Sequence, residues 1–196
     1  MIAILDYDAG NLTSVKKAVH HLGYSCVVTS EPHEVKLADK IVLPGVGHFS
    51  ATSNLEVRGL RAVVRNAISR EIPILGICLG MQWMFESSDE APGILGLALL
   101  PGRCHRFADR VKVPHVGWNH LQMRESGRLF RNVPSGAFMY FTHSYWAPLI
   151  ECTTAECEYG STFSAAIERG NLFGVQFHPE KSGDPGLTIL RNFCEL

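Results

Sequence analysis

The first half of the chain alternates short apolar runs with segments of helical periodicity. Apolar runs that are typical of buried strands lie at residues 1–5, 26–28, 41–43 and 74–77. Helical spacings, in which apolar residues recur every three or four positions, lie at residues 12–22, 60–68 and 81–85. Strands and helices that alternate in this rhythm predict a parallel sheet with helices on both faces.

The second half has a different pattern, in which Pro, Gly and short strand-like runs dominate from Pro92 onward. Strands are predicted at residues 138–142, 163–167 and 172–177. The final helix is indicated by a candidate cap at Asp184, a Pro in its first turn, and an apolar face made by Leu187, Leu190 and Phe193. We therefore expect one α/β domain over residues 1–196, with a single open, mostly parallel sheet and antiparallel strands added in the second half.

Composition narrows the class of protein further. The 196 residues are 46% hydrophobic and 19% charged, which is a globular balance, and Lys+Arg 18 against Asp+Glu 19 gives a net charge of −1. This charge supplies no overall positive field for nucleic acid or anionic lipid. No apolar run is as long as a membrane span, and no basic segment precedes the apolar N-terminal run, so we expect neither a membrane anchor nor a secretory signal.

The spacing of the cysteines and histidines suggests neither a disulfide bond nor a metal centre. Six cysteines occur without any CxxC spacing, which favours free thiols in a reducing cytoplasm over a disulfide framework. The histidines between residues 105 and 120 show no ligand spacing, so we expect neither a metal site nor a cofactor. Each cysteine is then either a small core residue or a nucleophile.

Cys78 is the strongest candidate nucleophile. It lies in Gly76-Ile77-Cys78-Leu79-Gly80, between a predicted buried strand and a predicted helix. A Gly-x-Cys-x-Gly turn in that position holds its side chain above the carboxyl edge of the sheet, and the following helix N-terminus favours a thiolate. The N–H of Leu79 would lie where an oxyanion forms. The alternative is a core cysteine between two chance glycines; the strand before and the helix after favour the nucleophile.

His178 is the best candidate base, with Glu180 as its orienting partner. His178 follows the predicted strand at 172–177, and a parallel strand would bring it to the sheet edge that carries Cys78. Glu180 can accept a hydrogen bond from the imidazole and fix its tautomer. Taken alone, this segment is better interpreted as a loop histidine beside a solvated glutamate. Taken together with the Cys78 turn, it favours a catalytic base. His143, at the end of another predicted strand, is the second choice for the base.

A glycine-rich loop, Pro44-Gly45-Val46-Gly47, follows the predicted strand at 41–43. In a parallel sheet it would lie at the edge that carries Cys78, where the N–H groups of Val46 and Gly47 could supply a second oxyanion donor and bind substrate. An ordinary glycine turn is the alternative. The loop lacks the Lys and Ser/Thr of a phosphate-binding loop.

Together these segments resemble the class I, triad-type glutamine amidotransferases. The nucleophile and His-Glu segments carry the resemblance to the whole family. It extends over most of the chain through further segments: Asp6-Tyr7-Asp8-Ala9-Gly10-Asn11-Leu12, Pro44-Gly45-Val46-Gly47, Pro114-His115-Val116-Gly117-Trp118-Asn119, Tyr140-Phe141-Thr142-His143-Ser144-Tyr145 and Glu180-Lys181-Ser182. Within the family, they are most similar to glutaminase subunits of histidine biosynthesis.

This resemblance implies a flavodoxin-like fold and a defined reaction. Cys78 attacks the amide carbon of glutamine, His178 transfers the proton to ammonia, Glu180 orients His178, and the backbone of Leu79, Val46 and Gly47 stabilises the oxyanion. The residues that it implies for substrate binding are Gly47, Gln82, Ser144 and Tyr145. Ammonia then passes to a separate cyclase barrel, so the resemblance implies a heterodimer, with glutamine as substrate and no nucleic-acid or membrane partner.

Other interpretations remain open at the level of sequence. The chain could supply ammonia to another amidating enzyme, for example one that acts on surface sugars, or it could be an interaction protein without activity. Arg58, Arg61 and Arg65 lie on one predicted helix face and could be read as a nucleic-acid surface. With a net charge of −1, a solvated face is the better interpretation.

Overall fold

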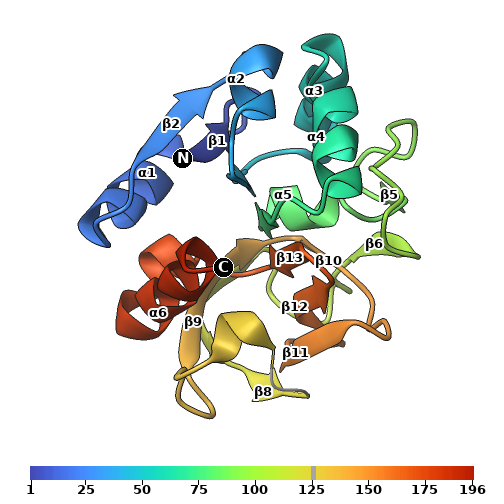
Figure 1. The fold of residues 1–196 in the computed structure, drawn as a ribbon. Coiled ribbons are helices and arrows are strands. Elements are labelled where there is room, and N and C mark those ends of the chain that lie inside the picture. The colour runs from blue at the N-terminus through green and yellow to red at the C-terminus, as the bar shows by residue number, and fades with distance from the viewer. Residues whose placement is uncertain (125–126) are drawn as a thin grey trace.

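The computed structural model describes residues 1–124 and 127–196. Within these residues, one eight-stranded sheet runs through the molecule in the order β2-β1-β3-β4-β13-β12-β11-β8 (Figure 1). The strands of its parallel half are β1 (Ile2–Leu5), β2 (Cys26–Thr29), β3 (Lys40–Leu43), β4 (Ile74–Ile77) and β13 (Leu172–Val175). The antiparallel strands are β12 (Thr162–Arg169), β11 (Thr153–Glu158) and β8 (Gln122–Met123). The predicted sheet is confirmed.

Helices cover both faces of the parallel half, as expected. Figure 1 shows α1 and α6 on one side and α3 and α4 on the other. The helices are α1 (Leu12–His21), α2 (Pro32–Lys36), α3 (Ser53–Val57), α4 (Leu60–Ser69), α5 (Leu79–Gln82) and α6 (Gly183–Cys194). Alternate residues of β1 separate the two cores: Ile2 and Ile4 pack with α1 and α6, whereas Ala3 and Leu5 pack with α2 and α4.

Two smaller sheets lie beside the main one. Their strands are β5 (Ser87–Ser88), β6 (Arg103–Arg106), β7 (His115–His120), β9 (Phe138–His143) and β10 (Tyr145–Trp146). Antiparallel β7 and β9 form one sheet, and β10, β6 and β5 form the other. Short 3-10 helices complete the described chain: η1 (Phe49–Thr52), η2 (Arg128–Phe130) and η3 (Pro179–Lys181).

Two predicted helix boundaries were wrong. The helix expected at 81–85 is the single turn α5, which begins at Leu79 and ends at Gln82. It cannot continue because the N–H groups of Leu97, Leu99 and Leu100 bond to the carbonyls of Trp83 and Met84, and so draw the chain out of the helical path. The last helix begins at Gly183, so Ser182 is its capping position and Asp184 lies in the first turn.

The arginines expected on a solvated face are engaged with backbone carbonyls. Arg61 donates to Leu95 and Gly96 oxygens at 2.8 and 3.0 Å, and Arg65 donates to the Leu97 oxygen at 2.6 Å. Arg58 precedes α4 and donates to the Asp6 carbonyl at 3.0 Å. These side chains therefore hydrogen-bond to the carbonyls of neighbouring loops, and they do not form a continuous basic surface free to bind nucleic acid.

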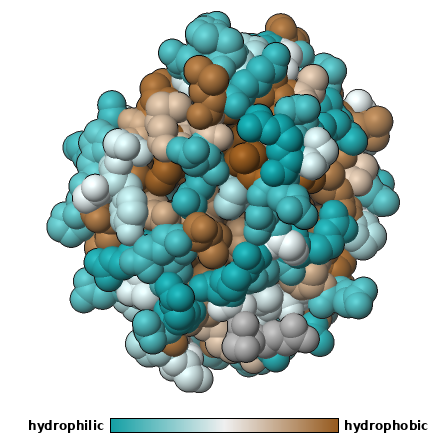
Figure 2. All heavy atoms as spheres, in the orientation of Figure 1, coloured by the Kyte–Doolittle hydropathy of each residue, from teal (hydrophilic) through white to brown (hydrophobic). Residues whose placement is uncertain are grey.

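The face drawn in Figure 2 is mainly hydrophilic, with small separate groups of apolar side chains. Large hydrophobic side chains on β7 and β9 are well exposed, with Val116 at 56%, Trp118 at 56% and Phe138 at 58%. Within residues 1–124 and 127–196, no helix has both the length and the apolar character needed to span a bilayer.

Candidate active site

Cys78 lies in a strained turn between β4 and α5. Its φ of 52° and ψ of −106° are unusual for a residue with a side chain, which is the geometry expected of a nucleophile elbow. The flanking glycines are required by packing. A Cβ on Gly80 would overlap the Leu43 carbonyl oxygen, and one on Gly76 would lie 2.7 Å from the Gly80 backbone. The Gly-x-Cys-x-Gly pattern therefore has a steric cause in this fold.

Parallel pairing brings His178 to the same edge of the sheet as Cys78. β13 pairs in parallel with β4, with Val175 opposite Ile77, and Cys78 N–H donates to the Val175 oxygen at 2.7 Å. His178 follows β13 and is fully buried. Its N–H donates to the Tyr140 oxygen of β9 at 2.9 Å, which holds the backbone beside the small sheet.

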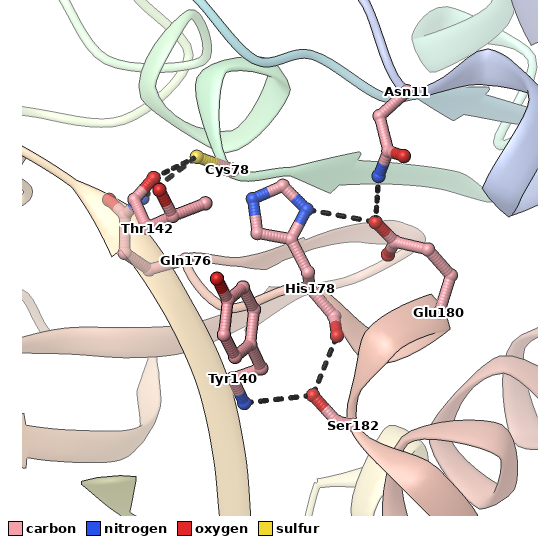
Figure 3. A network of polar contacts seen from close by, with 8 residues as sticks. All are labelled: Asn11, Cys78, Tyr140, Thr142, Gln176, His178, Glu180 and Ser182. Atoms are coloured by element: carbon pink, nitrogen blue, oxygen red, sulfur yellow. Dashed lines mark hydrogen bonds and ion pairs between the residues drawn. The ribbon is translucent and has the colours of Figure 1, made fainter. Parts of the chain in front are cut away.

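Glu180 contacts the ring of His178, as the sequence predicts. His178 Nδ1 and Glu180 Oε1 are 2.9 Å apart, and both side chains are almost wholly buried. The same carboxylate oxygen accepts a hydrogen bond from the side-chain amide of Asn11 (Figure 3). With Nδ1 donating to the carboxylate, the proton-accepting position of a neutral His178 is Nε2.

The electrostatic surroundings favour a charged His178. Burial by itself lowers the pKa of His178, but the neighbouring Cys78 and Glu180 outweigh it and raise that pKa to about 10. His178 Nε2 has no hydrogen-bond partner among the described residues. In Figure 3 this nitrogen lies on the side of the ring that faces Cys78. The ring can therefore receive a proton from the thiol and hold it against the carboxylate.

Both ring nitrogens of His143, the second choice for the base, are occupied by contacts with other residues. Its Nδ1 lies 2.8 Å from the Tyr145 oxygen, and its Nε2 lies 3.0 Å from His115 Nδ1. Burial lowers the pKa of His143 to about 3. A neutral ring with both nitrogens occupied is a poor general base, so this geometry favours His178 over His143 for that role.

A small cavity adjoins the sulfur. It measures about 170 Å³. Its walls are formed by Gly47, Cys78, Leu79, Gln82, Glu90, Pro114, Thr142, His143, Ser144 and Tyr145. All the residues expected to bind substrate therefore line one cavity with the expected nucleophile. Glu90 was not predicted from the sequence; its Oε2 accepts from Phe49 N–H at 2.7 Å.

Two glutamines connect the cavity wall with the sulfur. Gln82 Nε2 donates to the Tyr145 oxygen at 2.8 Å and to Gln176 Oε1 at 3.0 Å. Gln176 Nε2 lies 3.5 Å from Cys78 Sγ, and the sulfur lies 3.9 Å from the Thr142 oxygen. Gln176 was not predicted either, although it stands two residues before His178 in the segment that the sequence singled out.

The expected oxyanion donors are not all available in this arrangement. Leu79 N–H donates to the Gly45 oxygen at 3.3 Å, so a carbonyl occupies the place where an oxyanion would bind. Gly45 is packed too closely for any side chain, because a Cβ there would overlap the Tyr7 hydroxyl. Gly47 has a φ of 126°, a conformation open mainly to glycine. The loop lies beside Leu79, and the Gly45 oxygen occupies the N–H that was expected to bind an oxyanion.

The remaining cysteines have the properties of structural thiols. Burial raises the pKa of Cys157 and of Cys194 to about 12, and it raises the pKa of Cys104 as well. These thiols stay protonated at neutral pH, so they are poor nucleophiles. Among the residues that the structure describes, no group of three or more His, Cys, Asp or Glu side chains is arranged to hold a metal ion.

Known proteins similar to this chain share its full length. The sequence model of a family described as "Glutamine amidotransferase class-I" matches residues 3–196. A relative from Moorella thermoacetica is 50% identical over 198 residues, which span 100% of this chain and 94% of the relative. A relative from Methanothermobacter thermautotrophicus is 47% identical and covers 100% and 98%. Both are named "Imidazole glycerol phosphate synthase subunit HisH".

Solved structures support the fold. A chain described as "Crystal structure of glutamine amidotransferase" superposes with a TM-score of 0.78 at 19% identity, covering 99% of this chain and 97% of that one. A chain from the structure of PurLQS from Thermotoga maritima gives a TM-score of 0.76 at 16% identity, covering 99% and 97%. At these identities the likeness concerns the arrangement of strands and helices.

Proposed function

The chain belongs to the class-I glutamine amidotransferases, and we propose that it is the glutaminase subunit of an imidazole glycerol phosphate synthase. In this role it hydrolyses glutamine to glutamate and ammonia, and it passes the ammonia to a separate cyclase subunit in histidine biosynthesis. The full-length similarity to relatives named as that subunit supports the assignment. The observation that carries the chemistry is the buried His178–Glu180 pair, at 2.9 Å, beside the elbow that holds Cys78.

The proposed reaction uses a thioester intermediate. The Cys78 thiol transfers its proton to His178 Nε2, and the sulfur attacks the side-chain amide carbon of glutamine. The tetrahedral intermediate collapses as the C–N bond breaks, and His178 gives its proton to the departing ammonia. Water, deprotonated by His178, then attacks the thioester, and glutamate leaves as the thiol reforms. Glu180 keeps the imidazolium oriented and balances its charge.

The cavity beside Cys78 suits a small polar substrate. We assign Gly47, Gln82, Ser144 and Tyr145 to glutamine binding, which their common position in the cavity wall supports. The Nε2 of Gln82 is already engaged, so its oxygen is the group left for a ligand. The Glu90 carboxylate adds a negative charge to the wall, which complements the α-ammonium group of glutamine.

Oxyanion stabilisation needs a rearrangement. The proposed donors are the N–H of Leu79 and the N–H groups of Val46 and Gly47. Because the Gly45 oxygen accepts from Leu79 N–H, the site can complete the hole when the Gly45–Val46 peptide rotates and withdraws that oxygen. Such a rotation changes the ψ of Gly45, and the absence of a side chain at that residue supports a low steric cost for it.

The exposed apolar face of β7 and β9 is the proposed docking surface for the cyclase subunit. It consists of Val116, Trp118 and Phe138. The face borders the active site, because Trp118 packs against Tyr140, whose backbone bonds both to His178 and to Ser182. A partner seated there lies close to the site of ammonia release. The same proposal includes a heterodimer, a single domain over residues 1–196, no cofactor and a cytoplasmic location.

A reconstituted assay tests this function. The chain is mixed with the cyclase subunit from the same genome, and synthesis is followed with either glutamine or ammonium salt as nitrogen source. We expect a stable complex that uses both sources, and a Cys78→Ala complex that uses ammonium salt alone. A chain that releases glutamate only with a different ammonia-accepting enzyme would reassign the pathway. A chain that hydrolyses no glutamine in any complex would be an interaction protein.

A further inference from the structure

We propose that Gln176 is a further catalytic residue, whose side-chain amide donates a hydrogen bond to the Cys78 sulfur and stabilises it as a thiolate. The proposal rests on the function above, because it takes Cys78 as the nucleophile. Gln176 Nε2 lies 3.5 Å from Cys78 Sγ, within the range of a hydrogen bond to sulfur. Gln176 is fully buried, so the contact is sheltered from bulk water.

The backbone holds Gln176 in position for this contact. The residue directly follows β13, the neighbour of the strand that leads into Cys78. Its own N–H donates to the Ala165 oxygen of β12 at 2.8 Å, which ties it to the sheet on the other side. Figure 3 shows its side chain reaching from the sheet edge toward the sulfur. The donor is therefore carried by the rigid part of the fold.

A second glutamine fixes which end of the Gln176 amide faces the sulfur. Gln82 Nε2 donates to Gln176 Oε1 at 3.0 Å. If the Gln176 amide were reversed, its NH₂ group would face the NH₂ group of Gln82, and two donors would oppose each other in a buried site. The oxygen of Gln176 therefore stays on Gln82, and its NH₂ group stays on Cys78.

Two polar neighbours of the sulfur besides His178 act differently on the thiol and the thiolate. The Thr142 oxygen, at 3.9 Å, can only accept, so it interacts favourably with a protonated sulfur. Gln176 can donate to either form, and its hydrogen bond becomes stronger when the sulfur carries a charge. When the thiol proton moves to His178 Nε2, the sulfur loses the contact with Thr142 and keeps the one with Gln176. A buried thiolate without such a donor would be costly.

The same contacts connect substrate binding with the nucleophile. Gln82 lines the cavity and also donates to the Tyr145 oxygen at 2.8 Å. If Gln82 moves, the Gln176 amide loses its partner, and its hydrogen bond to the Cys78 sulfur changes as well. We infer that the Gln82–Gln176 hydrogen bond couples the position of Gln82 in the cavity wall to the hydrogen bond that Gln176 donates to Cys78.

The pH dependence of Cys78 alkylation tests the proposal. Full-length chain is treated with iodoacetamide between pH 5 and 10, without glutamine or partner, and the Cys78 peptide is quantified by mass spectrometry. In Gln176→Met, which keeps the volume but loses the donor, we expect the alkylation midpoint to rise by about one pH unit or more. In Gln176→Glu, which keeps the shape, we expect a rise at least as large, because a carboxylate then faces the sulfur.

The control is a second buried amide far from the sulfur. Asn192 on α6 is buried, and its Nδ2 donates to the Leu129 and Arg131 oxygens at 2.8 and 2.7 Å. Asn192→Met should lose stability in thermal unfolding without moving the alkylation midpoint of Cys78. A folded Gln176→Met chain with an unchanged midpoint would overturn the proposal. If that variant fails to fold, the midpoint of Gln176→Glu decides.

A double-mutant cycle tests the connection through Gln82. Gln82→Met should raise the midpoint by less than Gln176→Met does, and the double variant should match Gln176→Met. Independent, additive shifts would overturn the connection. The alkylation assay needs no turnover, so it separates the two proposals. A shift in Gln176→Met together with no glutamate release by any complex would reject the function and retain only the hydrogen bond from Gln176 to the sulfur.

Discussion

Asn11 donates from its side-chain amide to Glu180 Oε1, the same oxygen that lies 2.9 Å from His178 Nδ1. The carboxylate that orients the imidazole is therefore itself oriented, from the opposite end of the sequence. Asn11 has a φ of 74°, a left-handed conformation that Asn and Gly adopt more easily than other residues. Its position just before α1 thus serves both the backbone turn and the carboxylate.

This relationship predicts a moderate effect of Asn11 on turnover. Asn11→Gly keeps the left-handed backbone and removes the amide, so we expect the glutamine kcat of the complex to fall about 10-fold while KM changes little. Asn11→Asp should be more harmful, because a second carboxylate faces Glu180. Steady-state kinetics of the two variants provide the check. A normal kcat in Asn11→Gly would show that Glu180 needs no support from Asn11.

Cys78 should be the only catalytic thiol. A diazo-ketone analogue of glutamine should add one label, on the peptide that contains Cys78, because that thiol alone adjoins both His178 and the cavity. Cys78→Ala should abolish hydrolysis and leave folding intact. Cys194→Ala is the matched control, since burial raises the pKa of Cys194 to about 12, and it should keep the label. Label on Cys104 or Cys194 with Cys78 untouched would refute the assignment.

His178 and Glu180 should behave as one unit. His178→Ala removes the base, and we expect at least about a 10³-fold loss in kcat. Glu180→Gln removes only orientation and charge support, so its loss should be smaller, and the double variant should resemble His178→Ala. Turnover of the three variants measures this. If His143→Ala silenced the enzyme and His178→Ala did not, the triad would have to be redrawn around His143.

The sequence could predict how the strands bring distant segments together, but not the contacts between side chains. Parallel strands end at one edge, so Cys78 and His178 could be expected to meet although they are far apart in the chain. Asn11 and Gln176 could not be assigned in the same way. Each bonds to its catalytic partner across 169 and 98 residues of sequence, and only the folded backbone shows which amide faces which atom.

The boundaries of α5 show a second limit of sequence reasoning. The sequence predicts a helix over residues 81–85, and the apolar residues Met81, Met84 and Phe85 are indeed buried. The helix ends after Gln82 because the N–H of Leu97 donates a hydrogen bond to the Trp83 oxygen at 2.6 Å, in place of the next helical N–H. A local pattern contains no information about a competing partner that lies farther along the chain.

Acid should destabilise the fold through two buried histidines. Burial lowers the pKa of His115 to about 4 and that of His143 to about 3, whereas an unfolded histidine titrates near 6.5. Between these values the unfolded chain binds more protons, so their contribution to stability is complete above pH 6.5 and is lost as the pH falls. His178, whose pKa is raised to about 10, is charged in both states below pH 6.5, so its stabilising contribution is complete there and adds no slope as the pH falls further.

Thermal unfolding between pH 4 and 7 measures this effect. The midpoint should fall with pH, and His115→Phe should flatten the slope, because His115 is stacked on Phe141 and Tyr159 and a phenyl ring can take its place. Asp39 is a useful contrast, since its exposed carboxylate pairs with the N-terminus and its removal should leave the slope above pH 5 unchanged. A midpoint that does not depend on pH in the wild-type chain would contradict the assignment of neutral buried rings.

The closed oxyanion site predicts that the partner controls turnover. Leu79 N–H is occupied by the Gly45 oxygen at 3.3 Å, and one missing donor costs roughly 10²–10³ in rate. Hydrolysis by the isolated chain should therefore be slow.

The cyclase subunit with its own ligand should favour the arrangement in which the Gly45–Val46 peptide has rotated. It should raise kcat more than it lowers KM, because the freed donor acts mainly on the transition state. Kinetics of the chain alone and in complex decide this. Equal kcat in both states, or a gain confined to KM, would show that the Gly45 oxygen does not limit the enzyme.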